Sequence, residues 1–259
     1  MKLIYTNQNR KDDTFRELIS MWNESGFVTV EIGNDPFVWV DKVGDILLYD
    51  HPRIDDRPIP QFRHGLFGNT VPSCKTCHSW IFWGRRPKLM EEQIELGIPN
   101  FSERTTNSIF LGKVENHVQL NARTNLDWST VVEQFSMPIL IGDITTYPFT
   151  QVEYLEQIKK SKFGLVLPGY GPKCNREIEY MGLGTVPIFT PGTDTRYHEP
   201  LIEGEHFFYA DSLDKFDYYV ESTSESTWSR MSRNCMEWYD RNCSRKGSFE
   251  TTKRILETL

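Results

Sequence analysis

The sequence has no long uninterrupted hydrophobic run and few cysteines for its length. Its 259 residues include only five cysteines, an odd number that does not suggest a disulfide framework and so indicates a reducing compartment. No stretch has the length of an apolar membrane span, and the first residues, MKLIYTNQNRKDD, return to charge too early for a signal peptide. We therefore expect a soluble, cytoplasmic protein with no membrane span.

Positive charge is not in excess either. Lys and Arg total 29 against 36 Asp and Glu, giving a formal net charge of −7, so no nucleic-acid partner is expected. No GxxxxGK[ST] loop occurs, and no GxGxxG follows the first predicted strand, which disfavours a P-loop enzyme and a dehydrogenase. The chain has no Asp-x-Asp pair, because Asp12-Asp13 and Asp55-Asp56 are adjacent residues.

The chain does contain alternating short apolar strands and amphipathic helices, the pattern of an α/β protein. Strands are predicted at 2–6, 27–32, 37–40 and 45–49, and again at 108–111, 137–141, 163–167 and 186–189. Between these two groups, residues 50–86 lose the pattern and are rich in Pro, Gly, His and charge. A loop of that length is usually functional. Residues 227–259 are predicted to be mostly helical.

The stretch FGLVLPGYGPKCNREIEYMGLGTVPIF, residues 163–189, predicts a strand, a glycine-rich turn, a helix and a second strand. Gly169 and Gly171, on either side of Tyr170, would let the backbone approach a ligand closely. Free N–H groups and the helix dipole favour an anion at this end of the helix, and Arg176 adds a cation suited to phosphate. Glu179 lies on the same helix face and could accept hydrogen bonds from a ribose. The stretch is typical of a nucleotide-diphosphate site.

The residue types alone leave a second interpretation open. Arg176 and Glu179 could form a surface salt bridge, and the glycines could serve only the turns. Lys113 and Arg123, near the first strand of the second group, could meet the diphosphate from the other side of a cleft. They could equally be an exposed pair at the start of a helix.

The longer run YLEQIKKSKFGLVLPGYGPKCNREIEYMGLGTVPIF resembles the nucleotide-sugar-binding region of exostosin-like glycosyltransferases, with a weaker echo at IFLGKVENHVQLNAR. The resemblance implies a GT-B-like α/β fold, in which two Rossmann-like domains face each other across a cleft and C-terminal helices pack back. It also implies an inverting, metal-independent transfer from a UDP-sugar. Eukaryotic relatives are usually anchored in secretory membranes and no anchor is expected here, so a small soluble member, of the kind a large DNA virus or a microbe encodes, fits better. The residues that carry the match are Tyr154, Ser161, Phe163, Pro168, Gly169, Arg176, Glu179, Gly184 and Pro187.

The sequence also departs from the family pattern. Lys173-Cys174-Asn175 stands where the family has a small hydroxylated run, and the N-terminal half carries no recognisable family motif. On this interpretation residues 1–97 form an acceptor domain, 98–226 a nucleotide-sugar domain, and 227–259 the C-terminal helices. The expected partners are a nucleotide sugar, with UDP-xylose preferred as donor, and an oligosaccharide or glycoprotein glycan acceptor. No cofactor and no metal are expected.

An inverting transferase needs a general base opposite the leaving group. The expected candidates are Asp50, His51 and Asp55, which follow the strand predicted at 45–49, with Asp56 and His64 as alternates. Ligands of open α/β sheets bind outside the carboxyl ends of strands, which is where Asp50 would stand.

Two other kinds of protein remain possible at this point. The chain could be another nucleotide-sugar enzyme, such as an epimerase, or a sugar- or nucleotide-binding protein without catalysis. The run Cys74-Lys-Thr-Cys77-His78 matches a c-type haem pattern and could hold zinc with a fourth ligand. Haem attachment is not favoured, because it needs a translocated protein. A zinc site is not favoured, because the sequence has no second CxxC pair.

Overall fold

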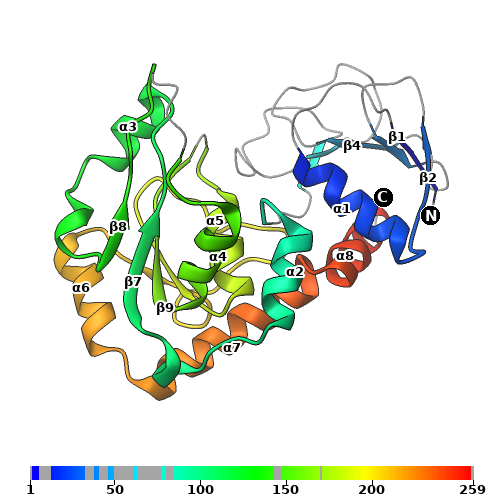
Figure 1. Cartoon of the computed structure of the whole chain (residues 1–259). Helices are drawn as coiled ribbons and strands as arrows, with labels where there is room; N and C mark the ends of the chain where they lie inside the picture. Colours follow the sequence, from blue (N-terminus) through cyan, green and yellow to red (C-terminus); the bar gives the residue numbers. More distant parts are fainter. Residues whose placement is uncertain are drawn as a thin grey trace.

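The computed structural model describes residues 2–5, 13–32, 38–40, 46–49, 61–63, 77–79, 84–142, 147–169 and 171–257. Its centre is an all-parallel sheet of five strands in the order β8-β7-β9-β10-β11. This is a Rossmann-like α/β fold, seen on the left of Figure 1. The strands are β7 (Thr106–Leu111), β8 (Gln134–Ser136), β9 (Ser161–Val166), β10 (Val186–Phe189) and β11 (Phe208–Tyr209).

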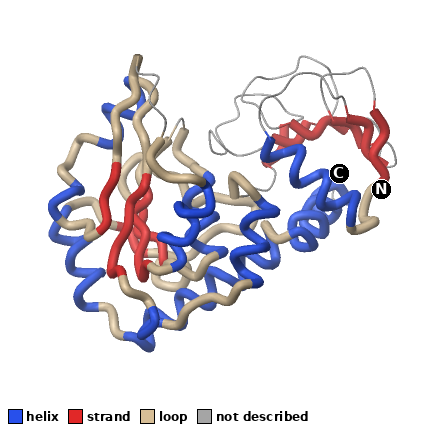
Figure 2. The backbone as a smooth tube through the Cα atoms, viewed as in Figure 1, coloured by secondary structure: helices blue, strands red, loops and turns tan. Residues whose placement is uncertain are grey.

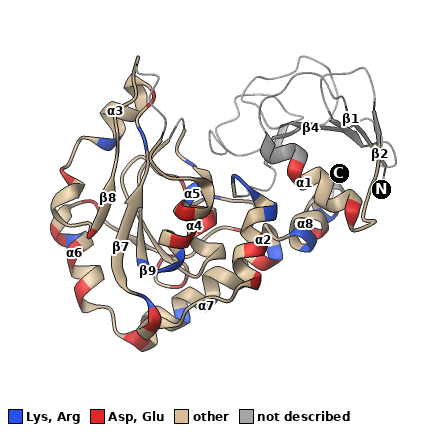
Figure 3. Cartoon of the chain, viewed as in Figure 1, with Lys and Arg blue, Asp and Glu red and all other residues tan. Residues whose placement is uncertain are grey.

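Helices cover both faces of this sheet (Figure 2), so its strands are apolar on both sides. Ile109 and Leu111 of β7 join one core cluster with α4 (Gln151–Lys159) and α5 (Asn175–Gly182). Phe110, between them, points to the other face and packs with residues of α6 (Leu213–Ser222) and the first half of α7 (Glu225–Asn242). Lys, Arg, Asp and Glu lie mainly on the helices and loops (Figure 3).

A second group of strands pairs in the order β2-β1-β3-β4-β5-β6, with β3 antiparallel to both of its neighbours. Beside these strands lie α1 (Asp13–Glu24) and α8 (Arg245–Glu257) (Figure 1). The strands are β1 (Lys2–Tyr5), β2 (Thr29–Ile32), β3 (Val38–Val40), β4 (Ile46–Tyr49), β5 (Gln61–Arg63) and β6 (Cys77–Ser79).

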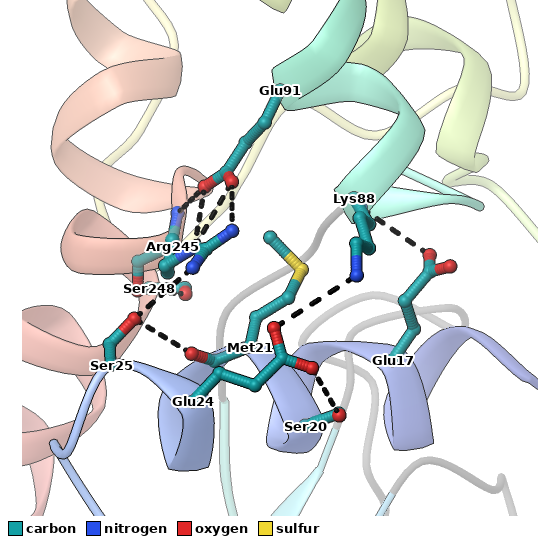
Figure 4. A network of polar contacts seen from close by, with 9 residues as sticks. All are labelled: Glu17, Ser20, Met21, Glu24, Ser25, Lys88, Glu91, Arg245 and Ser248. Carbon is teal, nitrogen blue, oxygen red and sulfur yellow. Dashed lines mark hydrogen bonds and ion pairs between the residues drawn. The ribbon is translucent and has the colours of Figure 1, made fainter.

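Polar contacts join α1, α2 (Pro87–Glu95) and α8 (Figure 4). The Trp22 indole N–H donates to Ser248 Oγ at 2.9 Å, and both side chains are fully buried. Arg245 holds Glu91 with an Nη2–Oε2 distance of 2.7 Å. α2 also contacts α4 and α5, so it lies between α1 and the helices of the five-stranded sheet. The remaining described helices are α3 (His117–Arg123) and the short 3₁₀ helices at Phe101–Glu103 and Trp128–Thr130.

The sequence-based elements differ from the structure in three places. The strand predicted at 137–141 lies earlier, at β8, where Gln134, Phe135 and Ser136 pair with the end of β7. The apolar run that follows makes only one isolated bridge, from Ile139, which is 55% exposed. The predicted loop at 50–86 contains the short strands β5 and β6, and α6 and β11 were not predicted. None of the described helices is both long and apolar enough to cross a bilayer.

Candidate functional site

The five-stranded sheet changes winding direction between β7 and β9. From β7 the chain passes to β8 on one side, and then returns to β9 on the other side. At such a switch point the loops after the two central strands diverge and leave a crevice at the carboxyl edge, where ligands of these sheets bind. Here the two loops are residues 112–115, after β7, and residues 167–174, after β9.

Arg176, the second residue of α5, lies at this switch point. Its guanidinium carbon is 4.4 Å from the centre of the Phe110 ring. A Cβ on Gly112, directly after β7, would lie 2.9 Å from Arg176 Nη2, so the guanidinium reaches across from α5 to the end of β7. Its Nε and Nη1 are out of contact with solvent and have no hydrogen-bond partner among the described residues.

A buried donor without a partner costs about 1–3 kcal/mol, and more when it is charged. Oxygens of an anion at this position would accept hydrogen bonds from these nitrogens, and the dipole at the start of α5 would add to the attraction. Arg176 and Glu179 do not form an ion pair in the structure, because each faces other groups. The surface salt bridge considered for them is therefore wrong.

Arg123, at the end of α3, reaches the same crevice, but two of its nitrogens donate to backbone carbonyls. Its side chain is 3% exposed, Nε donates to Pro168 O at 2.6 Å, and Nη1 donates to Lys113 O. Burial, together with the neighbouring charge of Arg176, lowers the pKa of Arg123 to about 10. Arg123 ties the β7 loop to the β9 loop and adds positive charge beside Arg176.

Lys113 contributes less to this charge. Its ammonium pairs with Glu115 at 2.7 Å on a partly exposed part of the loop. The structure thus brings Arg176 and Arg123 together at the carboxyl edge, whereas the Lys113 side chain has a local partner.

The glycines of the β9 loop have an internal packing role. A Cβ on Gly169 would lie 2.4 Å from Cys174 Sγ, so the thiol fills the space that a side chain would need. Gly171, half-buried, accepts a hydrogen bond from the Gly169 N–H at 3.0 Å. Tyr170, predicted as a third donor-binding residue here, lies outside the described residues.

Lys173, which precedes Cys174 in the β9 loop, contacts the segment after β10. Lys173 is 2% exposed, donates to Arg196 O and lies 3.8 Å from the Asp194 carboxylate. The Asp194 N–H in turn donates to Pro172 O at 2.9 Å. These contacts fix the loop that leads into α5, and so help to position Arg176.

Glu179 is buried and fully engaged. Its Oε1 accepts from the Arg85 backbone N–H at 2.9 Å and its Oε2 from the Tyr154 hydroxyl at 2.8 Å. Burial raises the pKa of Glu179, and these hydrogen bonds oppose that shift. Through these two hydrogen bonds the Glu179 carboxylate joins α5 to α4 and to the residues before α2. That Glu179 binds a ribose stays a prediction.

Two residues of the site were missed by sequence reasoning. Glu177 of α5 is completely buried, and burial raises its pKa to about 7. Tyr147 lies in the segment between β8 and α4, and its hydroxyl is out of solvent contact without a partner among the described residues. The only sequence signal for Glu177 was that the predicted helix contains another Glu besides Glu179. Nothing in the neighbouring sequence marks Tyr147.

The predicted base residues Asp50, His51 and Asp55 lie outside the described residues, as do Asp56 and His64. The last described residue before them is Tyr49, where β4 ends. In the described ranges, no group of three or more His, Cys, Asp or Glu side chains could hold a metal ion.

Comparison with known proteins adds no relative to these observations. No protein-family model matches this chain, and no curated protein is significantly similar to it.

Proposed function

We propose that this protein is an inverting glycosyltransferase that moves a sugar from a UDP-sugar to a hydroxyl of a glycan acceptor. One observation carries the proposal: Arg176, half-buried and with two solvent-excluded guanidinium nitrogens that have no described partner, lies at a helix N-terminus at the switch point of a Rossmann-like sheet. Such a position suits a diphosphate. The resemblance of residues 154–187 to exostosin-like enzymes extends this from diphosphate binding to sugar transfer.

In the proposed reaction the acceptor hydroxyl attacks the anomeric carbon while the bond to the diphosphate breaks. The anomeric carbon passes through an oxocarbenium-like state, as in glycoside hydrolysis. Negative charge grows on the leaving UDP, where Arg176, Arg123 and the N-terminus of α5 would stabilise it. The acceptor proton would pass to a base on the N-terminal part, for which Asp50, His51 and Asp55 remain the candidates. We expect the reaction to need no metal.

The first prediction tests the diphosphate site. UDP at about 100 times its Kd should stabilise the wild-type protein by about 2.7 kcal/mol, seen as a rise of the unfolding temperature. Arg176→Ala should abolish this rise and lower sugar transfer by about 100- to 1000-fold, because one donor to the developing charge is lost. Arg233→Ala, which removes an exposed arginine on α7, is the matched control and should behave as wild type.

Ligand binding and product analysis together decide the outcome. An Arg176→Ala protein that UDP still stabilises would contradict the diphosphate site. Free UDP together with a glycosylated acceptor would support transfer, with UDP-xylose as the first donor to try. An isomerised donor would indicate an epimerase, and binding without any product would indicate a binding protein.

A further inference from the structure

Tyr147 lies in the connection from β8 to α4, which begins beside the β7 loop. Beyond the end of β8 the chain continues alongside the β7 loop, because the Val114 N–H donates to Pro138 O at 2.9 Å and the Leu140 N–H donates to Val114 O at 2.7 Å. The same connection ends at Thr150, the N-cap of α4, and α4 is bonded to α5 through Tyr154 and Glu179. Along the chain, Tyr147 thus lies between a segment that runs beside the β7 loop and a helix that is bonded to α5.

Tyr147 lies close enough to the charges of the candidate site to interact with them. Burial raises its pKa to about 12, Arg176 and Arg123 lower it, and Glu179 raises it, so all three charged groups lie within electrostatic reach. The ring packs on Phe149, with centroids 5.6 Å apart. The hydroxyl itself has no hydrogen-bond partner among the described residues and does not touch solvent.

Buried tyrosine hydroxyls usually have a partner, because water would otherwise supply the bond that is lost on burial. Here an unpartnered hydroxyl accompanies two unpartnered guanidinium nitrogens on Arg176. All three are donors, and a ligand rich in acceptors and poor in donors would satisfy them together. A diphosphate has that chemistry, whereas a second guanidinium or an ammonium does not.

We propose that the Tyr147 hydroxyl is a further ligand-binding group of this site and donates a hydrogen bond to an oxygen of the diphosphate that Arg176 holds. This inference rests on the proposed function, since it assumes a diphosphate at Arg176. It adds Tyr147, which precedes α4, to the site, so that the ligand is held by groups from two parts of the chain: Tyr147 and the start of α5.

The test is Tyr147→Phe, which removes only the hydroxyl. Binding of UDP and of inorganic pyrophosphate should weaken by about 10- to 100-fold, the effect of one hydrogen bond to a charged group. Without ligand the variant should unfold at the same temperature as wild type or slightly higher, because the lost hydroxyl had no partner. A merely structural tyrosine would show the opposite pattern, with lower stability and unchanged affinity.

Two further tyrosines provide matched controls. Tyr154→Phe removes a buried hydroxyl that does have a partner, Glu179 at 2.8 Å, and should lower the unfolding temperature without ligand. Tyr218→Phe changes a 63% exposed residue on α6 and should alter neither stability nor binding.

The outcomes separate the two proposals. If UDP binds neither wild type nor variant, the proposed function fails. If UDP and pyrophosphate bind wild type and Tyr147→Phe equally well, the function survives and the role of Tyr147 is overturned. A loss seen with UDP-xylose but not with UDP or pyrophosphate also overturns it, because the hydroxyl would then contact the sugar and not the diphosphate.

Discussion

At the scale of single residues, burial decides what each charged side chain of α5 can do. Arg176 lies at the crevice with unpartnered nitrogens, whereas Glu179 has both oxygens bonded inside the protein. Glu177 stands between them in sequence and is 0% exposed. Its Oε1 accepts from the Cys174 N–H and from the Tyr197 hydroxyl at 3.2 Å, and its Oε2 has no described partner. A carboxyl in this environment is more stable when protonated.

The protonation of Glu177 predicts a pH dependence of stability. Burial raises its pKa from 4.5 to about 7, although hydrogen bonds and Arg176 oppose this shift. The folded state therefore binds a proton that the unfolded state releases. The resulting stabilisation is complete below about pH 4.5 and is lost as pH rises through 7. Over this range wild type should lose about 3 kcal/mol relative to Glu177→Gln, which keeps an amide in place of the carboxyl.

Urea unfolding of both proteins at several pH values between 4.5 and 8 measures this difference. Taking the difference removes the contribution of groups that the two proteins share, such as His198 and His206, whose pKa values are lowered by burial. Glu237→Gln, at an exposed position of α7, serves as control. Parallel curves for wild type and Glu177→Gln would contradict the prediction, because they would show that the pKa of Glu177 is the same in the folded and unfolded states.

At the scale of elements, the loop from β9 into α5 is held by close packing. Gly169 approaches Cys174 so closely that an added Cβ would lie 2.4 Å from the thiol sulfur. Lys173, next to this cysteine, is buried against the segment after β10. The sulfur thus has little room to move away, and the loop sets where α5 begins.

Gly169→Ala should therefore destabilise the protein by about 1–3 kcal/mol, the usual cost of overpacking. Because the clash is with one sulfur atom, Cys174→Ala should relieve it. The cost of Gly169→Ala should fall below about 1 kcal/mol in the Cys174→Ala background, and a double-mutant cycle by chemical denaturation measures this coupling. Equal costs in both backgrounds would mean that backbone conformation, and not the thiol, requires glycine.

At the scale of the whole molecule, the last helix connects the end of the chain to its beginning. α7 leads from the five-stranded sheet to α8, and α8 lies against α1 (Figure 1). The bond from Trp22 to Ser248 joins residues 226 positions apart and is fully buried. The Arg245–Glu91 pair adds α2 to the same joint (Figure 4).

Ser248→Ala should weaken this joint, because it leaves the Trp22 indole N–H buried without an acceptor at a cost of about 1–3 kcal/mol. Hydrogen exchange should show loss of protection in α1 and α8, with β9 unchanged. Ser20→Ala, which removes an exposed bond to Glu24 on the same helix, should cost less than about 0.5 kcal/mol. Uniform loss of protection along the chain would show instead that the two parts unfold together.

Local patterns in the sequence determined much of the five-stranded part. Buried apolar runs at β7, β9 and β10, helical spacing at α4, and the glycines before α5 are visible along the chain, and the structure has these elements near their predicted positions. Arg176 was placed at the start of a helix after a strand, which depends only on neighbouring residues. The strand predicted at 137–141 was wrong because an apolar run does not reveal where pairing with β7 ends.

Only the tertiary structure decided which polar groups are satisfied. Glu179 is bonded to Arg85, 94 positions away, and Arg123 to Pro168, 45 positions away, so no local pattern could distinguish these engaged side chains from Arg176. The same holds for Tyr147, because no local pattern shows that its hydroxyl has no hydrogen-bond partner among the described residues. Periodicity reports which face of an element is buried, but hydrogen bonding depends on which distant segments the fold brings together.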